Sequence, residues 1–345
     1  MPHYIYGFLM SMVLAYLTTP FVMKLAWKIG AIDVPKDARR VHKKPMPRLG
    51  GLAIYISFMV TGLLILPLEL PYVRGIFLGG SIIVILGILD DIYNLPAKVK
   101  LLGQLAAAGV LVLFGVKVEI LTNPLGGMII LGKLAIPATL FWVVGITNTL
   151  NFIDGLDGLA AGIAAIAAFT MMLVNLSLEQ ANGALVMALL AGAAIGFLPY
   201  NFNPAKIFMG DTGSMFLGFI LAAQAMEGMV KSATVIALIV PILALGLPIF
   251  DTVYAILRRF VHGKPIMQAD KGHVHHRLIA IGLSQKQAVL FMYVISISLG
   301  ICSVILAMLG VTQALIAFAV VVFMLLLFAR HINTTLEAKK TTHGM

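Results

Sequence analysis

Long runs of apolar residues alternate with short polar stretches along almost the whole chain. A helix needs about 20 such residues to cross a hydrocarbon core of about 30 Å. Eleven runs have this character, at residues 4–28, 49–68, 72–89, 99–116, 137–151, 156–176, 182–199, 212–229, 233–258, 287–309 and 312–330. The pattern therefore predicts an all-α integral membrane protein, a polytopic bundle of about 11 transmembrane helices.

Residues 116–134 depart from this pattern. Polar and apolar residues alternate there around a turn-forming stretch that contains Asn123, Pro124, Gly126 and Gly127, which is typical of a hairpin. We expect a small extracytoplasmic hairpin, within one transmembrane domain at residues 1–331. Its expected cytoplasmic active-site loops lie at about 29–48, 90–98, 151–156, 199–212 and 259–286, and residues 332–345 form a short cytoplasmic tail.

Composition supports the membrane assignment, because 61% of the 345 residues are hydrophobic, 11% are charged and the mean hydropathy is +1.03. A soluble domain does not have these values. The single cysteine, Cys302, lies inside an apolar run, so a disulfide framework is excluded.

Charge gives the orientation of the chain. If the amino terminus lies outside, 20 of the 24 Lys and Arg residues fall on the cytoplasmic face, and only Arg74, Lys117, Lys133 and Lys231 fall on the other. Cytoplasmic loops of membrane proteins carry such an excess. We therefore expect a multi-pass plasma-membrane protein with a cytoplasmic carboxyl terminus.

The aspartates follow the same asymmetry. All nine fall on the cytoplasmic face, whereas four of the five glutamates fall outside. This segregation indicates a site rather than general solvation of loops. The net charge of +10 also suits anionic lipid headgroups, which is a sufficient explanation for Lys339 and Lys340.

Two pairs of aspartates stand out. Asp90 and Asp91 are adjacent at a membrane boundary, where they repel each other unless a cation or proton lies between them. A polar helix end is the alternative explanation. Asp154 and Asp157 continue a series from Asn148 and Asn151 that would share one helix face. Gly155 and Gly158 interrupt the series, and helix capping is the competing explanation.

Asp211 follows Gly210 at the start of a run, where a carboxylate can hold a hard cation while backbone amides face phosphate oxygens. Capping by Thr212 or Ser214 is compatible with this prediction. Basic loops accompany the aspartates, one before the second run and one with the stretch GHVHHRL. A zinc site in that stretch is disfavoured, because no second group of suitable ligands and no cysteine is available. The histidines and arginine of this stretch are better explained as hydrogen-bond donors to a diphosphate.

Five stretches of the chain stand out, HKKPMPRLGG, DDIYNLPAKVK, NTLNFIDGLDGLAAG, NFNPAKIFMGDTGS and GHVHHRL. They occur in the order found in the polyprenyl-phosphate N-acetylhexosamine-1-phosphate transferases, a family that the chain resembles over nearly its whole length. The resemblance implies transfer of a sugar-1-phosphate from a UDP-sugar to a polyprenyl phosphate in the membrane, with release of UMP.

The resemblance also implies roles for single residues. Asp211 is expected to bind Mg²⁺, for which Mn²⁺ can substitute, and Asp90 and Asp91 are expected to be catalytic. Residues expected to bind substrate are Lys43, Arg48, Lys98, Asn148, Asn151, Asp154, Asp157, Asn201, His273, His275, His276 and Arg277. Lys100 is an equal match for Lys98, and Arg48 stands where some relatives have threonine.

The chemistry fits such a site. A lipid phosphate, with a second pKa of about 6, is largely dianionic at neutral pH and needs no strong base. Repulsion from the diphosphate is the larger obstacle, which Mg²⁺ and fixed cations reduce. An aspartyl-phosphate intermediate on Asp90 or Asp91 stays open. The chain could also form a homodimer. No nucleic-acid partner is expected.

The stretch HVHHRL resembles the N-acetylglucosamine branch of the family, and Arg277 could donate hydrogen bonds to a small neutral sugar. We therefore expect UDP-N-acetylglucosamine as donor and undecaprenyl phosphate as acceptor, at the first committed step of teichoic acid, lipopolysaccharide or a related glycan. The alternative within the family is a phospho-N-acetylmuramoyl-pentapeptide transferase. A transporter is disfavoured because its ionisable residues would lie at mid-span, and a lipid-binding scaffold would have no use for paired aspartates.

Overall fold

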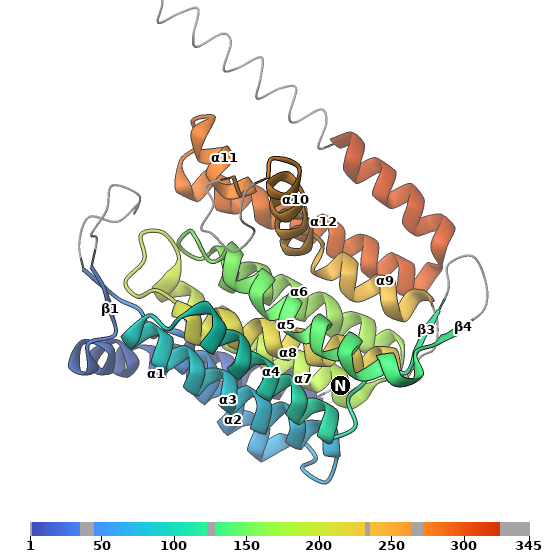
Figure 1. Cartoon of the computed structure of the whole chain (residues 1–345), viewed down its shortest axis with the longest axis horizontal. Helices are drawn as coiled ribbons and strands as arrows, with labels where there is room; N and C mark the ends of the chain where they lie inside the picture. Colours follow the sequence, from blue (N-terminus) through green and yellow to red (C-terminus); the bar gives the residue numbers. More distant parts are fainter. Residues whose placement is uncertain (1, 35–44, 123–127, 232–234, 264–271, 325–345) are drawn as a thin grey trace, which may run out of the picture.

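The structure, a computed structural model, describes residues 2–34, 45–122, 128–231, 235–263 and 272–324, and helices dominate it (Figure 1). Lys43, the hairpin tip with Asn123, and the expected tail at 332–345 lie outside the described residues.

Most helices coincide with the predicted runs. They are α1 (Pro2–Ile29), α2 (Gly51–Ile65), α3 (Pro71–Tyr93), α4 (Ala97–Leu113), α5 (Ala135–Ile153), α6 (Leu159–Ser177), α7 (Ala181–Asn201), α8 (Gly210–Lys231) and α12 (Gln285–Leu309). An apolar helix, Val311–Met324, follows α12. Within the described residues six helices are long and apolar enough to cross a membrane: α1, α3, α5, α6, α7 and α12. The protein is a polytopic membrane protein.

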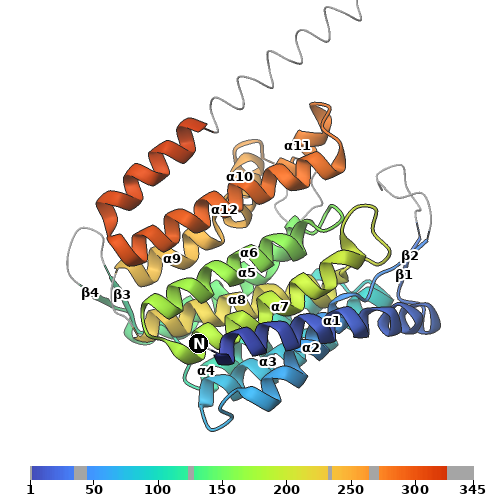
Figure 2. The same cartoon turned by 180° about the vertical axis from the view of Figure 1, so that it is seen from behind.

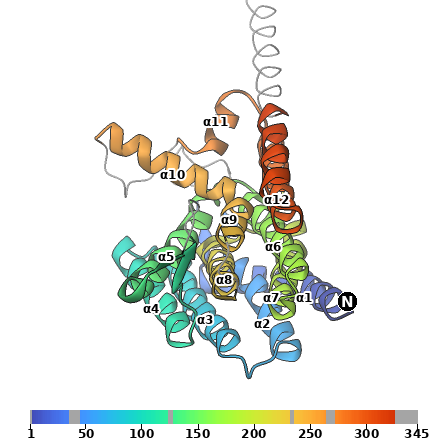
Figure 3. The same ribbon diagram turned by 90° about the vertical axis from the view of Figure 1, so that its right-hand side faces the viewer.

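Helix α8 lies at the centre of the bundle (Figure 3). Its residues from Thr212 to Glu227 are all buried, and it packs against α3 and α5. On another side of the bundle α1 runs along α7 and α2 (Figure 2). Buried polar groups usually have hydrogen-bond partners from neighbouring elements, and the start of α8 carries three polar side chains, on Asp211, Thr212 and Ser214.

Glycines bring three helix backbones together at the start of α8. A Cβ on Gly51 of α2 would overlap the backbone of Gly213, and a Cβ on Gly87 of α3 would overlap the backbone of Thr212. No side chain fits between these segments, so α2 and α3 hold the start of α8 by direct backbone contact.

The single helix expected at residues 233–258 is wrong. The chain forms α9 (Val235–Ala244) and α10 (Gly246–Val261) instead, and α10 turns away from the bundle (Figure 3). Pro248 lies in the first turn of α10, where a helix does not use the backbone N–H that proline lacks. In a continuous helix, the same proline would remove one hydrogen bond and interrupt the helix. The apolar run concealed this break.

Short elements complete the two ends of the bundle. Strands β3 (Ile120–Thr122) and β4 (Met128–Ile130) form the predicted antiparallel hairpin, followed by the 3-10 helix η1 (Gly132–Leu134). The opposite end carries β1 (Ile32–Asp33), β2 (Met46–Pro47) and α11 (Val274–Ala280), none of which the sequence predicted (Figure 1).

Candidate active site

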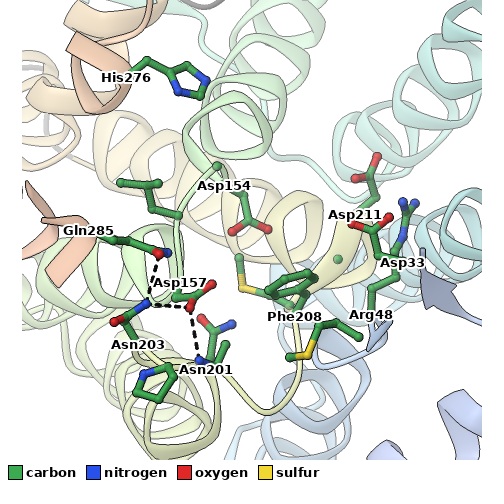
Figure 4. Close-up of a pocket in the computed structure, with 17 residues that line it drawn as sticks. Asp33, Arg48, Asp154, Asp157, Asn201, Asn203, Phe208, Asp211, His276 and Gln285 are labelled. Atoms are coloured by element: carbon green, nitrogen blue, oxygen red, sulfur yellow. Dashed lines mark hydrogen bonds between the residues drawn. The ribbon is translucent and has the colours of Figure 1, made fainter. Parts of the chain in front are cut away.

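A pocket of about 490 Å³ opens at the end of the bundle that carries β1 and β2. Loops from distant parts of the sequence meet there (Figure 4). The residues lining it are Asp33, Met46, Arg48, Asp154, Gly155, Leu156, Asp157, Asn201, Asn203, Pro204, Ala205, Phe208, Met209, Gly210, Asp211, His276 and Gln285. The structure therefore brings Arg48, Asp154, Asp157, Asn201, Asp211 and His276 of the predicted site to one cavity.

Asp91 holds the start of α8 in place. Its carboxylate accepts the N–H of Asp211 at 2.9 Å, and the N–H and hydroxyl of Thr212 at 3.1 and 2.6 Å. Arg48 Nε donates to the same carboxylate at 3.0 Å, and the Asp91 side chain is fully buried. Capping of α8 by Thr212 or Ser214 was compatible with the sequence, but in the structure the Asp91 side chain from α3 accepts the free amides of Asp211 and Thr212.

Lys100 joins two further carboxylates. Its Nζ lies 3.1 Å from Asp90 Oδ2 and 2.7 Å from Asp211 Oδ2. The other Asp90 oxygen accepts the N–H of Leu95 at 2.7 Å, so Asp90 is fully engaged. Lys98 is exposed at the start of α4. Of the two equal matches, Lys100 is the one at the site.

The loop between α5 and α6 carries Asp154 and Asp157. Helix α5 ends at Ile153 and Gly158 adopts a φ of +78° before α6, so the glycines do interrupt the series. Asp157 Oδ2 accepts bonds from Asn203 Nδ2 and Ala205 N, at 3.0 and 3.1 Å. Burial, with the nearby carboxylates of Asp211, Asp91 and Asp157, raises the pKa of Asp154 to about 8. Burial and neighbouring carboxylates thus both favour the protonated form of Asp154.

The asparagines that begin this series lie deeper. Asn148 exchanges hydrogen bonds with Gln104 across α4 and α5, at 2.8 and 3.2 Å, and Asn151 donates to Ser214 at 2.9 Å. Neither lines the pocket. Both were predicted to bind substrate, and the structure places them in contacts between helices instead.

Asn201 lines the pocket, but its side chain is buried and links two backbone segments by hydrogen bonds. Its Oδ1 accepts the N–H of Gly158 and its Nδ2 donates to the carbonyl of Ile207, at 3.1 and 3.0 Å. Nearby, Asn203 Nδ2 donates at 3.0 Å to Gln285 Oε1 as well as to Asp157. Asn203 and Gln285 were missed from the sequence. Asn203 stood inside a recognised stretch, whereas nothing in the pattern around Gln285 distinguished it.

The three histidines have different environments. His273 Nδ1 lies 2.8 Å from Asp251 Oδ2, and His276 lines the pocket (Figure 4). His275 is 1% exposed, and burial, reinforced by His276, lowers its pKa to about 3. A neutral, buried imidazole does not neutralise a phosphate, so only His276 of the three is placed to do so.

Arg277 lies outside the pocket. Its guanidinium sits 5.5 Å from the centre of the Tyr254 ring on α10, and Nη1 lies 3.3 Å from the Tyr254 hydroxyl. The structure therefore places this arginine beside Tyr254 and not among the residues that line the pocket.

The pocket suits a magnesium ion. Within the described residues no three His, Cys, Asp or Glu side chains form a group that could hold a metal. However, Mg²⁺ commonly uses one or two carboxylates together with substrate phosphates and water. Asp211 fits that role, because 23% of its side chain is exposed and it faces a pocket that also contains Asp154 (Figure 4).

Comparison with known proteins agrees with the motifs. The sequence profile described as glycosyl transferase family 4 matches residues 73–229. The chain is similar to a probable undecaprenyl-phosphate N-acetylglucosaminyl 1-phosphate transferase of Bacillus subtilis, with 43% identity over 92% of this chain and 89% of the relative. It is 38% identical to a decaprenyl-phosphate N-acetylglucosaminephosphotransferase of Mycolicibacterium smegmatis, over 91% and 85%. A phospho-N-acetylmuramoyl-pentapeptide-transferase of Bacillus thuringiensis is 31% identical over 79% and 87%.

Proposed function

The chain belongs to glycosyl transferase family 4, and from this membership we propose that it transfers N-acetylglucosamine-1-phosphate from UDP-N-acetylglucosamine to undecaprenyl phosphate, releasing UMP. The observation that carries the proposal is the match of nearly the whole chain to a relative named for this reaction. The product would begin a cell-envelope glycan such as teichoic acid.

The donor sugar rests on the relatives. Those named for N-acetylglucosamine reach 43% and 38% identity, whereas the muramoyl-pentapeptide enzyme reaches 31%. The earlier argument from Arg277 does not contribute, because this side chain lies on Tyr254 rather than in the pocket. The muramoyl-pentapeptide donor remains the second candidate.

The pocket supports in-line phosphoryl transfer. An oxygen of the lipid phosphate attacks the β-phosphorus of the UDP-sugar, and the bond from this phosphorus to the oxygen that bridges to UMP breaks. Lys100, Arg48 and His276 line or flank the pocket and are placed to offset the phosphate charge. Mg²⁺, when bound at Asp211, supplies charge neutralisation on the diphosphate.

Asp90 and Asp91 act on this site by positioning other groups. Asp91 fixes the start of α8, and with it the Asp211 carboxylate, while Asp90 fixes the Lys100 ammonium. The burial of both side chains supports direct displacement by the lipid phosphate over an aspartyl-phosphate intermediate. We place the pocket on the cytoplasmic side, where UDP-sugars are made and where the sequence concentrates its lysines and arginines.

The proposal is tested with the purified protein in detergent with undecaprenyl phosphate and Mg²⁺. UMP release is measured with UDP-N-acetylglucosamine and, separately, with UDP-N-acetylmuramoyl-pentapeptide. We expect release with the first donor and none when the lipid acceptor is omitted. Release with the second donor alone would show the donor assignment to be wrong, and release with neither would contradict the transferase proposal.

A further inference from the structure

Helix α11 stands between α10 and the loop that carries Asp154 and Asp157. On one side, the buried carboxylate of Asp251 on α10 accepts the N–H of Val274 at 2.8 Å and lies 2.8 Å from His273 Nδ1. Asp251 is 1% exposed, and these two contacts use both of its oxygens. A buried carboxylate is costly unless it is fully paired, so α11 is firmly attached to α10 at its first residues.

On the other side, the His275 ring covers Gly155. A Cβ built on Gly155 would lie 2.5 Å from His275 Nε2, 3.1 Å from Cε1 and 3.4 Å from Cδ2, and these are its three nearest neighbours. Real Cβ atoms essentially never approach another heavy atom within 3.0 Å. The ring itself is packed between its neighbours, with centroids 5.7 Å from His273 and 4.2 Å from His276.

We infer that His275 is a positioning residue of the transfer reaction, whose ring, held on α11 by the Asp251 contacts, fixes the Asp154–Asp157 loop by packing directly on Gly155. The inference rests on the proposed function for its activity readout. Its physical basis is that the loop bears two carboxylates of the pocket, and that a displacement of about 1 Å in such groups can cost about 10²-fold in rate. Glycine is required at 155 because the ring occupies the place of a side chain.

The contact is tested by a double-mutant cycle with UMP release and thermal unfolding as readouts. We expect Gly155→Ala to lower kcat by about 10²-fold, and His275→Ala to lower it by about 10-fold through loss of the support. The double variant should be more active than Gly155→Ala alone, because the new methyl group occupies the space vacated by the ring. The fold-reductions in kcat of the two single variants could instead multiply in the double variant. In that case the His275 ring is not what excludes the methyl group at position 155, and the inference fails.

Two further variants separate packing from chemistry. His275→Phe keeps a flat ring but has no nitrogen, so it should restore most of the activity that His275→Ala loses. If Phe is as inactive as Ala while folded, the imidazole acts chemically and the positioning role is wrong. Gly145→Ala on α5, where a Cβ meets nothing within 4 Å, is the matched control and should match the wild type.

Thermal unfolding distinguishes failure of this inference from failure of the proposed function. The unfolding temperatures of the four cycle proteins need no substrate. We expect Gly155→Ala to lower this temperature and the added His275→Ala to recover part of the loss. If the unfolding temperature recovers in the double variant but the wild type releases no UMP, the packing contact is supported and the proposed function is contradicted. An unfolding cycle without recovery would overturn the contact itself.

Discussion

At the scale of single residues, the site is built from carboxylates with separate tasks. The Asp91 carboxylate accepts hydrogen bonds from backbone amides and pairs with Arg48. The Asp90 carboxylate accepts one backbone amide and pairs with Lys100. Asp211 alone among these three keeps a partly exposed side chain at the pocket. Two of the recognised stretches contain these three residues, but a sequence pattern does not show which carboxylate is buried and which is partly exposed.

Asp211→Asn should lower kcat by about 10²-fold or more, because a charged ligand for Mg²⁺ and the ion pair with Lys100 are lost together. UMP release at rising Mg²⁺ concentration measures the effect. The control is Glu227→Gln, the same chemical change about 24 Å further along α8 at 1.5 Å per residue. Activity that is retained in folded Asp211→Asn would remove this residue from the metal site.

The pKa of Asp154 makes stability depend on pH. Its value of about 8 in the folded protein lies above the ordinary value of 3.8, so between these values the folded state binds a proton that the unfolded state has released. Stability therefore falls as pH rises through this window. We expect the unfolding temperature in EDTA to decline from pH 5 to pH 8 and Asp154→Asn to remove part of the decline. Identical pH dependence in both proteins would contradict the raised pKa.

Residue identity alone did not specify the side-chain position in two places. Lys98 and Lys100 are two positions apart and equally good matches, but only Lys100 reaches the carboxylates. Arg277 follows two histidines in a recognised stretch, yet it stacks on Tyr254. In both cases the direction of a side chain depends on tertiary packing, which a sequence pattern does not specify.

At the scale of elements, hydrophobic runs predicted the long helices well because lipid imposes a minimum length on each of them. The break between α9 and α10 was missed, since Pro241 and Pro248 lie within the two helices rather than between them, and prolines can also occur within transmembrane helices. Helix α11 was missed because it has only seven residues, too few for a periodic pattern to be recognised.

The backbone contact between α3 and α8 gives a prediction at this scale. Gly87→Ala should lower the unfolding temperature and abolish most activity, because the added methyl group meets the backbone of Thr212, which has no alternative rotamer. Such overpacking commonly costs about 1–3 kcal/mol. Gly109→Ala on α4 meets nothing within 4 Å and should leave both quantities unchanged. A stable, active Gly87→Ala protein would show that the two helices can separate.

At the scale of the whole molecule, the β3–β4 hairpin lies at the opposite end of the bundle from β1 (Figure 1), and Asp33 of β1 lines the pocket. From the cation asymmetry we propose that the pocket end faces the cytoplasm. Single cysteines at Ile130 on β4 and at Ile281 after α11, both exposed, test this in a Cys302→Ser background. An impermeant thiol reagent should label the first from outside intact cells and the second only in inverted vesicles. Labelling of both from the same side would contradict the orientation.

The backbone contacts of Gly51, Gly87 and Gly213 also limit how the pocket can change its shape. One wall, lined by Gly210 and Asp211 at the start of α8, rests on α2 and α3, with no side chain between Gly51 and Gly213 or between Gly87 and Thr212 that could repack. Induced fit to a donor nucleotide must therefore come from the other wall, formed by the Asp154–Asp157 loop, the segment from Asn203 to Phe208, and α11. Attempts to broaden donor choice by engineering would accordingly succeed in that second wall, while the glycine wall tolerates almost no variation.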